Sequence, residues 1–389
     1  MTDPRARLLS AWYVLAIGSV GAFHPYLAVI LDRRGASGTE LALCLALFPA
    51  GLLLCGPLWG LRTDRSARPQ RVIGVALTAA AAGALGMLVP GSWVVLVPAM
   101  ALLAMTRSPA VAVGDVLVVR LLGGGRTGEA AYGAVRSWGS VAFIGIVFAV
   151  GWLMDRWLVA PLVVHAALLL GLAALTWRLP APAPEQRAAA GPSTSVGAVL
   201  RSPLLGLYVV SVLHIGANSL YDNLFAHHVT GLGLGARVAG VAIALGVAVE
   251  VVVLFRGRWL LERFEPRVLL AIAVLAGIPR WWLTGTTGSP TVLVLTQSLH
   301  GLTFGFWWLG GIAHVLRMAP EGLRSTAQAA FVASGFGLGN LIALGIASYA
   351  LPTWGSARLF TGLTVVSMLA ALLLPWALSR RSSGSSARP

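Results

Sequence analysis

The amino-acid sequence predicts an all-α membrane protein with twelve transmembrane helices, arranged as two pseudo-symmetric bundles of six. Three observations predict this fold: a strongly hydrophobic composition, twelve long apolar runs, and a polar segment in the middle of the chain. Of the 389 residues, 57% are hydrophobic and 11% are charged, whereas a soluble domain has about 25% charged residues. So few charges cannot cover a water-soluble protein of this size, and much of the chain must lie in a bilayer.

The apolar runs have the length that a membrane helix requires, which is about 20 residues. The expected spans are 8–31, 39–61, 72–89, 93–119, 132–154, 158–178, 203–226, 237–257, 267–285, 291–316, 325–349 and 356–378. The first run lacks a short apolar core followed by a cleavage site, so we expect it to remain as a span.

The segment 180–202 contains a run rich in Pro, Ala and Ser, a composition typical of a flexible linker. It separates an expected domain 1–179 from an expected domain 203–389, each with six spans. An acid followed by arginine recurs at matched places in the two halves, as Asp64-Arg65 and Glu262-Arg263. A duplicated six-helix unit would leave such a repeat.

All basic residues are arginine, and the formal net charge is +15. With the N-terminus inside, 20 of the 28 arginines fall in cytoplasmic loops or tails and five in external loops. The other three, Arg107, Arg136 and Arg280, lie within spans. This asymmetry predicts that both termini are cytoplasmic. Because the arginines follow the loops rather than one soluble face, nucleic acid is not an expected partner.

Ionisable side chains within the spans are the most informative residues, because a charge at the bilayer centre costs about 2.5–3.5 kcal/mol. Each of them alone can be half of a structural ion pair. As a set spread over both halves, they predict a polar cavity at the midplane. They are Arg107, Asp115, Arg136, Asp222, Glu250 and Arg280, with His214 and His300 as further titratable groups.

Aromatic residues accompany several of these charges. Trp138 lies two residues after Arg136, and Tyr221 directly precedes Asp222. His300 is followed by Phe304 and Trp307 at positions i+4 and i+7, which makes an aromatic stripe on one helix face. The alternative for each aromatic residue is ordinary core packing, lipid contact or interfacial anchoring.

Two other patterns carry no predicted site. His227 and His228 are expected in a short external loop as a solvated pair, with metal binding as the alternative. Gly123–Gly125 is not a nucleotide fingerprint, because no strand and no phosphate-binding Lys surround it. The sequence therefore predicts no metal, no cofactor and no enzymatic activity.

The two six-span halves, the loop Gly60-x-x-x-Asp64-Arg65 and its repeat resemble the major facilitator superfamily along essentially the whole chain. The resemblance implies a secondary transporter of the cytoplasmic (inner) membrane of a bacterium, working as a monomer. It also implies that Asp64, Arg65, Glu262 and Arg263 are gating residues rather than substrate ligands.

A narrower resemblance, to the lactose-permease-like and phenylpropionate-permease-like branch, rests on five strings. They are Tyr132-Gly133-x-x-Arg136-x-Trp138-Gly139-Ser140, Tyr221-Asp222, Glu250, Arg280-Trp281 and Leu299-His300. The resemblance implies that Arg136 and Glu250 face the substrate, with Asp115 beside Arg136. It also implies that Asp222, Arg280 and His300 belong to the proton-coupling network.

The chain departs from lactose permease at Thr303, where that branch has its coupling Glu three residues after the helix-ten His. The proton site is then relocated to Glu250, Asp222 or Asp115, or absent. Glu250 is the first candidate, because it is a lone acid in a run of Ala, Leu, Gly and Val. An aromatic acid would suit Arg136 as a fork for its carboxylate. The side chains expected at its ring are those of Trp138, Phe304 and Trp307, and Tyr221 is a further expected substrate contact.

We therefore expect proton-coupled symport of a small organic solute (aromatic acid, sugar or nucleoside class) by alternating access. The alternative is an exporter of drugs or metabolites by proton antiport, for which the fold and charges would be the same. A sensor or scaffold without flux would carry a large soluble appendage, and a channel would carry a pore-ring motif; neither feature is present in the sequence. The expected partners are the solute, protons and membrane lipid.

Overall fold

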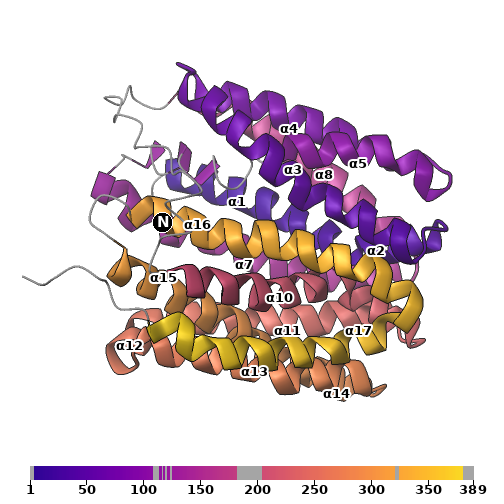
Figure 1. Ribbon diagram of the computed structural model, residues 1–389. Coiled ribbons are helices and arrows are strands. Elements are labelled where there is room, and N and C mark those ends of the chain that lie inside the picture. The colour runs from indigo at the N-terminus through magenta and orange to yellow at the C-terminus, as the bar shows by residue number, and fades with distance from the viewer. Residues whose placement is uncertain are drawn as a thin grey trace, which may run out of the picture. The chain divides into compact units, whose positions relative to one another are not determined.

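A computed structural model describes residues 4–107, 114–115, 117–118, 121–122, 125–181, 204–319 and 324–379. Within these ranges every regular element is a helix and no strand is found, as Figure 1 illustrates. The all-α prediction is therefore confirmed for the described part of the chain.

The helix boundaries follow the apolar runs. In the first half the helices are α1 (Pro4–Phe23), η1 (His24–Tyr26), α2 (Leu27–Arg33), α3 (Gly38–Asp64), α4 (Pro69–Gly86), α5 (Trp93–Arg107), α7 (Gly125–Met154) and α8 (Ala160–Trp177). In the second half they are α10 (Leu205–Gly231), α11 (Ala236–Phe255), α12 (Gly257–Arg263), α13 (Pro266–Thr286), α14 (Pro290–Thr296), η2 (Gln297–Leu299), η3 (Gly301–Phe306), α15 (Trp307–Met318), α16 (Arg324–Val332), η4 (Ala333–Gly339) and α17 (Asn340–Ser379).

Local sequence explains where several helices begin. Before α3, the Ser37 backbone N–H donates to the Glu40 carboxylate at 3.0 Å, and the two residues form a capping box. α4 and α13 begin at Pro69 and Pro266, which lack the N–H that the first helical turn cannot use. These start signals lie at or near the start of the predicted spans.

Among the described residues, seven helices are long and apolar enough to cross a membrane. The predicted span 291–316 is built from four consecutive elements, α14, η2, η3 and α15, rather than from one regular helix. The predicted span 93–119 contains α5, which ends at Arg107, and most of its remainder lies outside the described residues.

The last two predicted spans, 325–349 and 356–378, follow one another almost without a loop. α17 contains the C-terminal part of one and the whole of the other, and they are joined at Gly355, whose φ of +73° breaks the helical path. Only glycine adopts this backbone region readily. A single residue therefore supplies the turn that the sequence analysis places between the two spans.

Two segments of the second half are π-helical, η3 and η4, and both are rich in glycine. A π-turn leaves backbone groups outside the regular α-helical bonding pattern and is frequent at functional sites. In η3 the carbonyl oxygen of Thr303 is bonded by His214 Nε2 at 2.6 Å. The side chain of another helix thus satisfies a carbonyl within the irregular segment.

By their contacts the residues form two compact units, Met1–Arg187 with Asp222–Ala244, and Ala188–Tyr221 with Leu245–Pro389. The boundary between the units passes through α10 and α11, so these units differ from the expected domains 1–179 and 203–389. The domain assignment, including the linker 180–202 that lies mostly outside the described residues, stays a prediction.

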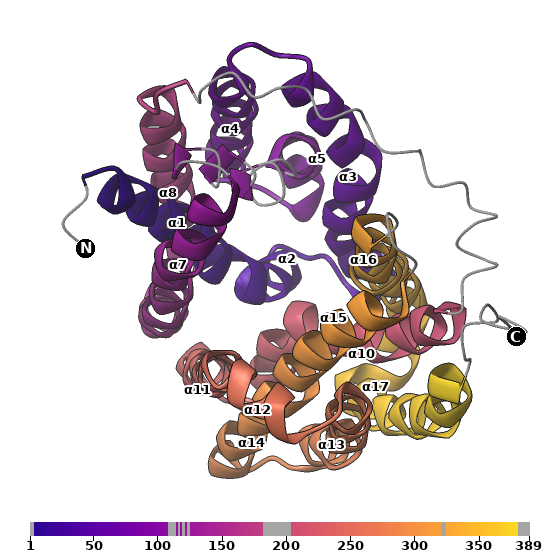
Figure 2. The same cartoon turned by 90° about the vertical axis from the view of Figure 1, so that its left-hand side faces the viewer.

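Within the first unit α1 packs on α7 and α8, and α4 packs on α5 and α8, as Figure 2 shows in a view along the helices. Small residues allow these close approaches: a Cβ on Gly83 of α4 would lie 2.9 Å from the carbonyl oxygen of Ala99 in α5. Within the second unit α13 packs on α17, and a Cβ on Gly285 would lie 2.6 Å from the carbonyl oxygen of Ala357.

The expectation of a loop at His227 and His228 is wrong. α10 continues to Gly231, so both histidines are helical, and His228 is buried. The His227 ring lies 3.5 Å from the Asp32 carboxylate in the same unit. The apolar run ends before these residues, but helix geometry persists because the chain packs against its neighbours rather than entering solvent.

Candidate functional site

Arg280 of α13 is the centre of a polar cluster inside the second unit, and its side chain is 0% exposed. Nη1 donates to Asn218 Oδ1 at 2.9 Å and to Thr303 Oγ1 at 2.7 Å. Nε and Nη2 both donate to Gln297 Oε1, at 3.2 and 3.1 Å. Side chains from α10, η2 and η3 thus supply the hydrogen bonds that a buried charge requires, and together they fix the orientation of the guanidinium.

Two aromatic rings lie against the same guanidinium. Its carbon is 4.2 Å from the ring centroid of Tyr221 and 4.4 Å from that of Trp281. Such cation–π contacts strengthen when water is excluded. Tyr221, which the sequence analysis assigns to the substrate site, is therefore also part of the surroundings of Arg280.

His300 connects Arg280 to Glu250. Arg280 Nη2 lies 3.1 Å from His300 Nδ1, and His300 Nε2 lies 3.3 Å from Glu250 Oε2. Arginine only donates, so Nδ1 must be the acceptor, and the ring proton of a neutral His300 is on Nε2. The His300 N–H then faces the Glu250 carboxylate. The imidazole ring thus contacts both the buried guanidinium and the acid.

The aromatic stripe on this helix differs by one residue from the sequence prediction. Phe304 stacks on His300 with centroids 5.3 Å apart, and Trp308 is parallel to Phe304 at 6.4 Å. Trp307 is instead fully buried against His214 and Phe331, at 4.5 and 6.1 Å. The ladder His300–Phe304–Trp308 leaves the last two rings partly exposed, whereas Trp307 belongs to the core.

Gln297 and Trp308 belong to this cluster and its aromatic ladder but were not predicted from the sequence. Gln297 is the one residue with a side-chain amide in the predicted span 291–316, and it lies three residues before His300, so the sequence could have identified it. It also donates to Thr284 Oγ1 at 3.3 Å, which extends the cluster along α13. The spacing of aromatic residues after His300 did not distinguish Trp308 from its neighbour Trp307.

The first unit contains a sparser set of polar side chains. Asp115 accepts a hydrogen bond of 2.5 Å from the Tyr13 hydroxyl of α1. Arg136 of α7 is partly buried and makes no hydrogen bond or ion pair with the described residues, and Trp138 is exposed. The structure therefore gives Asp115 a tyrosine partner, while the guanidinium of Arg136 has none in the described part of the chain.

The remaining predicted residues are placed as follows. Asp222 is partly buried in α10, in the first unit, so its membership of the Arg280 network stays a prediction. Arg65 is exposed at the end of α3, and the Asp64 side chain lies outside the described residues. Glu262 pairs with Arg258 at 2.8 Å, and the guanidinium of Arg263 lies 5.2 Å from the Trp259 ring. The gating role of these residues also stays a prediction.

No group of metal-ligating side chains occurs among the described residues. A sequence profile described as "MFS_1 like family" matches residues 7–360. The chain belongs to the major facilitator superfamily. The chain is therefore a multi-pass membrane transporter and not an enzyme, as the resemblance of the motifs predicts.

Two relatives extend this assignment. The chain is 30% identical to "Maltose permease" of Geobacillus stearothermophilus over 382 residues, which is 95% of this chain and 94% of the relative. It is 31% identical to "Probable 3-phenylpropionic acid transporter" of Escherichia coli (strain K12) over 210 residues, which is 52% of this chain and 55% of the relative.

Solved structures confirm the fold. A mutant of the nucleoside transporter NupG superposes with a TM-score of 0.85 at 16% identity, covering 96% of this chain and 100% of that one. A D-xylose-proton symporter superposes with a TM-score of 0.70 at 14% identity, covering 97% of each chain. The predicted major facilitator fold, with two bundles of six helices, is thereby confirmed.

Proposed function

We propose that this protein is a proton-coupled symporter of a small organic solute of the aromatic acid, sugar or nucleoside class, working by alternating access. The observation that carries the proposal is the continuous contact from Glu250 through His300 to Arg280 inside apolar helices. Ionisable residues in the membrane are costly and persist where they move ions or bind solutes. The names of the relatives, which concern maltose, 3-phenylpropionic acid, nucleosides and xylose with protons, support these solute classes.

Glu250 is the proposed proton carrier. Its side chain is 17% exposed, whereas His300 is 7% exposed and Arg280 is fully buried. Glu250 is therefore the most exposed of the three side chains, as suits the group that exchanges a proton with its surroundings. A proton on Glu250 removes its charge and weakens the hydrogen bond from His300, so the cluster senses the proton through a contact that joins α11 to the helix of His300.

Arg136 and the ring ladder are the proposed solute contacts. Arg136 has no partner among the described residues, so its guanidinium is available as a bidentate fork for a carboxylate or for sugar hydroxyls. Trp138 and Asp115 lie in the same unit as Arg136. Phe304 and Trp308 offer parallel partly exposed rings to the flat face of a solute. Asp222 completes the proposed coupling network.

The other predictions enter the proposal unchanged. Asp64, Arg65, Glu262 and Arg263 control the opening of the two ends rather than bind solute. The protein works as a monomer in the inner membrane of a bacterium with both termini in the cytoplasm, the orientation that the arginine distribution favours.

A thermal-shift screen of the purified protein against aromatic acids, sugars and nucleosides identifies the solute, and its repeat on Arg136→Ala identifies the site. We expect one class to raise the unfolding temperature of the wild type and to have no effect on Arg136→Ala. The hit is then added to the outside of proteoliposomes without a pre-set pH gradient. Alkalinisation of the outside medium supports symport, whereas acidification on solute entry identifies antiport and overturns the proposal.

A further inference from the structure

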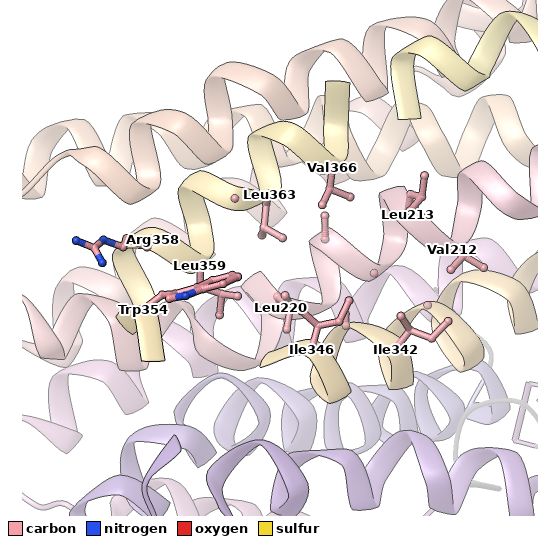
Figure 3. Close-up of a pocket in the computed structure, with 15 residues that line it drawn as sticks. Val212, Leu213, Leu220, Ile342, Ile346, Trp354, Arg358, Leu359, Leu363 and Val366 are labelled. Carbon is pink, nitrogen blue, oxygen red and sulfur yellow. The ribbon is translucent and has the colours of Figure 1, made fainter. Parts of the chain in front are cut away.

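An apolar groove lies between α10 and α17, within the second unit. One wall is the face of α10 over residues 212–220. The others belong to α17, namely Ile342, Ala343 and Ile346 before the Gly355 turn and the stretch 359–366 after it. The groove encloses about 200 Å³. Figure 3 shows its apolar side chains converging from these three stretches.

Glycines shape both the floor and the wall of this groove. A Cβ on Gly216 would lie 2.9 Å from the carbonyl oxygen of Gly339, so α10 and the end of η4 are in close contact at the floor. Gly362 is different, because a Cβ there would meet nothing within 4 Å. Space next to Gly362 is therefore open, and the side chains of Ile342 and Ile346, which also line the groove, are exposed.

The polar side chains that line the groove stand at one end of it, where Trp354 and Arg358 lie. Trp354 is exposed and lies edge-on to the exposed ring of Tyr349, with centroids 6.3 Å apart. Exposed Trp and Tyr mark the level of the lipid headgroups. Arg358 lies four residues after Trp354, beyond the Gly355 turn, and its guanidinium forms no hydrogen bond or ion pair within the described part of the chain. None of the described residues that line the groove is acidic.

The length of the groove matches one leaflet. From Arg358 to Val366 the helix rises about 12 Å, at 1.5 Å per residue. Half of the hydrocarbon core of a bilayer is about 15 Å thick. The groove thus extends from the headgroup level towards the midplane, with the Arg358 guanidinium at the headgroup end.

We propose that the α10–α17 groove binds one acyl chain of an anionic phospholipid, whose phosphate is held by the Arg358 guanidinium. The acyl chain fills the space next to Gly362 between Ile346 and Leu363. The planar guanidinium suits the phosphate oxygens in two-point hydrogen bonding, and Trp354 packs at the glycerol level. This assignment depends on the membrane fold alone and not on the identity of the transported solute.

The test is photo-labelling of the full-length protein in phosphatidylcholine nanodiscs that contain a phosphatidylglycerol with a diazirine in one acyl chain. After irradiation and digestion, we expect labelled peptides from 205–220 and 340–366. Unlabelled phosphatidylglycerol should compete about fivefold better than phosphatidylcholine, since a basic residue near an anionic headgroup contributes about 1 kcal/mol.

Three variants separate a built site from ordinary lipid contact. Arg358→Gln should remove the preference for phosphatidylglycerol while labelling persists. Gly362→Phe should fill the groove and abolish labelling of these peptides. Gly345→Phe is the matched control, because Gly345 is also exposed with open space around it but does not line the groove. If Gly362→Phe does not fold, Ile346→Trp fills the groove from the other wall.

Labelling that spreads evenly over all spans, or that survives both filling variants, overturns the proposal. Equal competition by the two lipids with Arg358 intact also overturns it, because the site then has no headgroup preference. Displacement of the label by a water-soluble transported solute, but not by phosphatidylglycerol, would identify the groove as a solute site instead. An unchanged preference in Arg358→Gln would exclude Arg358 as the phosphate ligand.

Discussion

Arg280 and Arg136 are both arginines within helices that cross the membrane, yet their surroundings are opposite. Arg280 is completely buried and bonded to Asn218, Gln297 and Thr303. Arg136 is partly buried and has no hydrogen bond or ion pair among the described residues. A guanidinium that is fully bonded is preorganised, whereas one with unused donors can bind a ligand. The same residue type thus suits the two roles proposed above, an internal link between polar groups for Arg280 and a solute contact for Arg136.

The largest expected difference between the two regions is in stability. Arg280→Leu leaves the oxygens of Asn218, Gln297 and Thr303 buried without their donor, and we expect a loss of about 3–5 kcal/mol. Arg136→Leu should change the free energy of unfolding by less than about 1 kcal/mol. Thermal unfolding of the purified variants in detergent measures both. Equal losses of stability in the two variants would contradict this prediction, because the buried hydrogen bonds of Arg280 would then contribute no more than the surroundings of Arg136.

The second-largest difference in stability is expected from helix packing next to Glu250 and His300. A Cβ on Gly301 would lie 2.5 Å from Val249 Cγ1 and 3.0 Å from the Glu250 backbone N, so Gly301→Ala must push α11 away. We expect a cost of about 1–3 kcal/mol, the range for overpacking. On α7, the helix of Arg136, a Cβ on Gly145 meets nothing within 4 Å. Gly145→Ala should be neutral or slightly stabilising, and the same melting experiment distinguishes the pair.

The smallest effect concerns a single hydroxyl. Thr303→Val keeps the side-chain shape but removes the acceptor that Arg280 reaches at 2.7 Å, so we expect a loss of about 1 kcal/mol. Ser140→Ala, one turn after Arg136, should stay within about 0.5 kcal/mol. Unfolding temperatures of the two variants, compared with the wild type, test this. A larger loss of stability in Ser140→Ala than in Thr303→Val would contradict this prediction, because the Ser140 hydroxyl would then have a stronger partner than the Thr303 hydroxyl.

The charged members of the Arg280 cluster could be predicted because charges stand out in apolar runs. Arg280, Glu250 and His300 are identified by the cost of a charge or titratable group in a membrane helix. Their neutral partners could not be paired from sequence. Asn218 and Gln297 are ordinary polar residues from separate helices, and only the packing of α10 and η2 on α13 brings them to the guanidinium.

The aromatic stripe was predicted one residue off for a local reason. Regular α-helical spacing places residues i, i+4 and i+7 on one face, which favoured Trp307. Position i+8 lies near the same face, so the spacing did not distinguish Trp308 from Trp307. In the structure Trp308 stacks on Phe304, four residues earlier, whereas Trp307 is buried in the core. The number of membrane spans was easier to predict than the contacts within them, because the length and hydropathy of the apolar runs determine it.

The most direct test of the account is proton-coupled uptake by Glu250→Gln in proteoliposomes. Glutamine keeps the size of the side chain but cannot carry the proton, so we expect solute-driven proton movement to be lost while solute exchange across the membrane continues. Glu265→Gln is the control, because Glu265 is an exposed carboxylate before α13, away from His300. Full proton-coupled uptake by Glu250→Gln would contradict the assignment of Glu250 as the proton carrier.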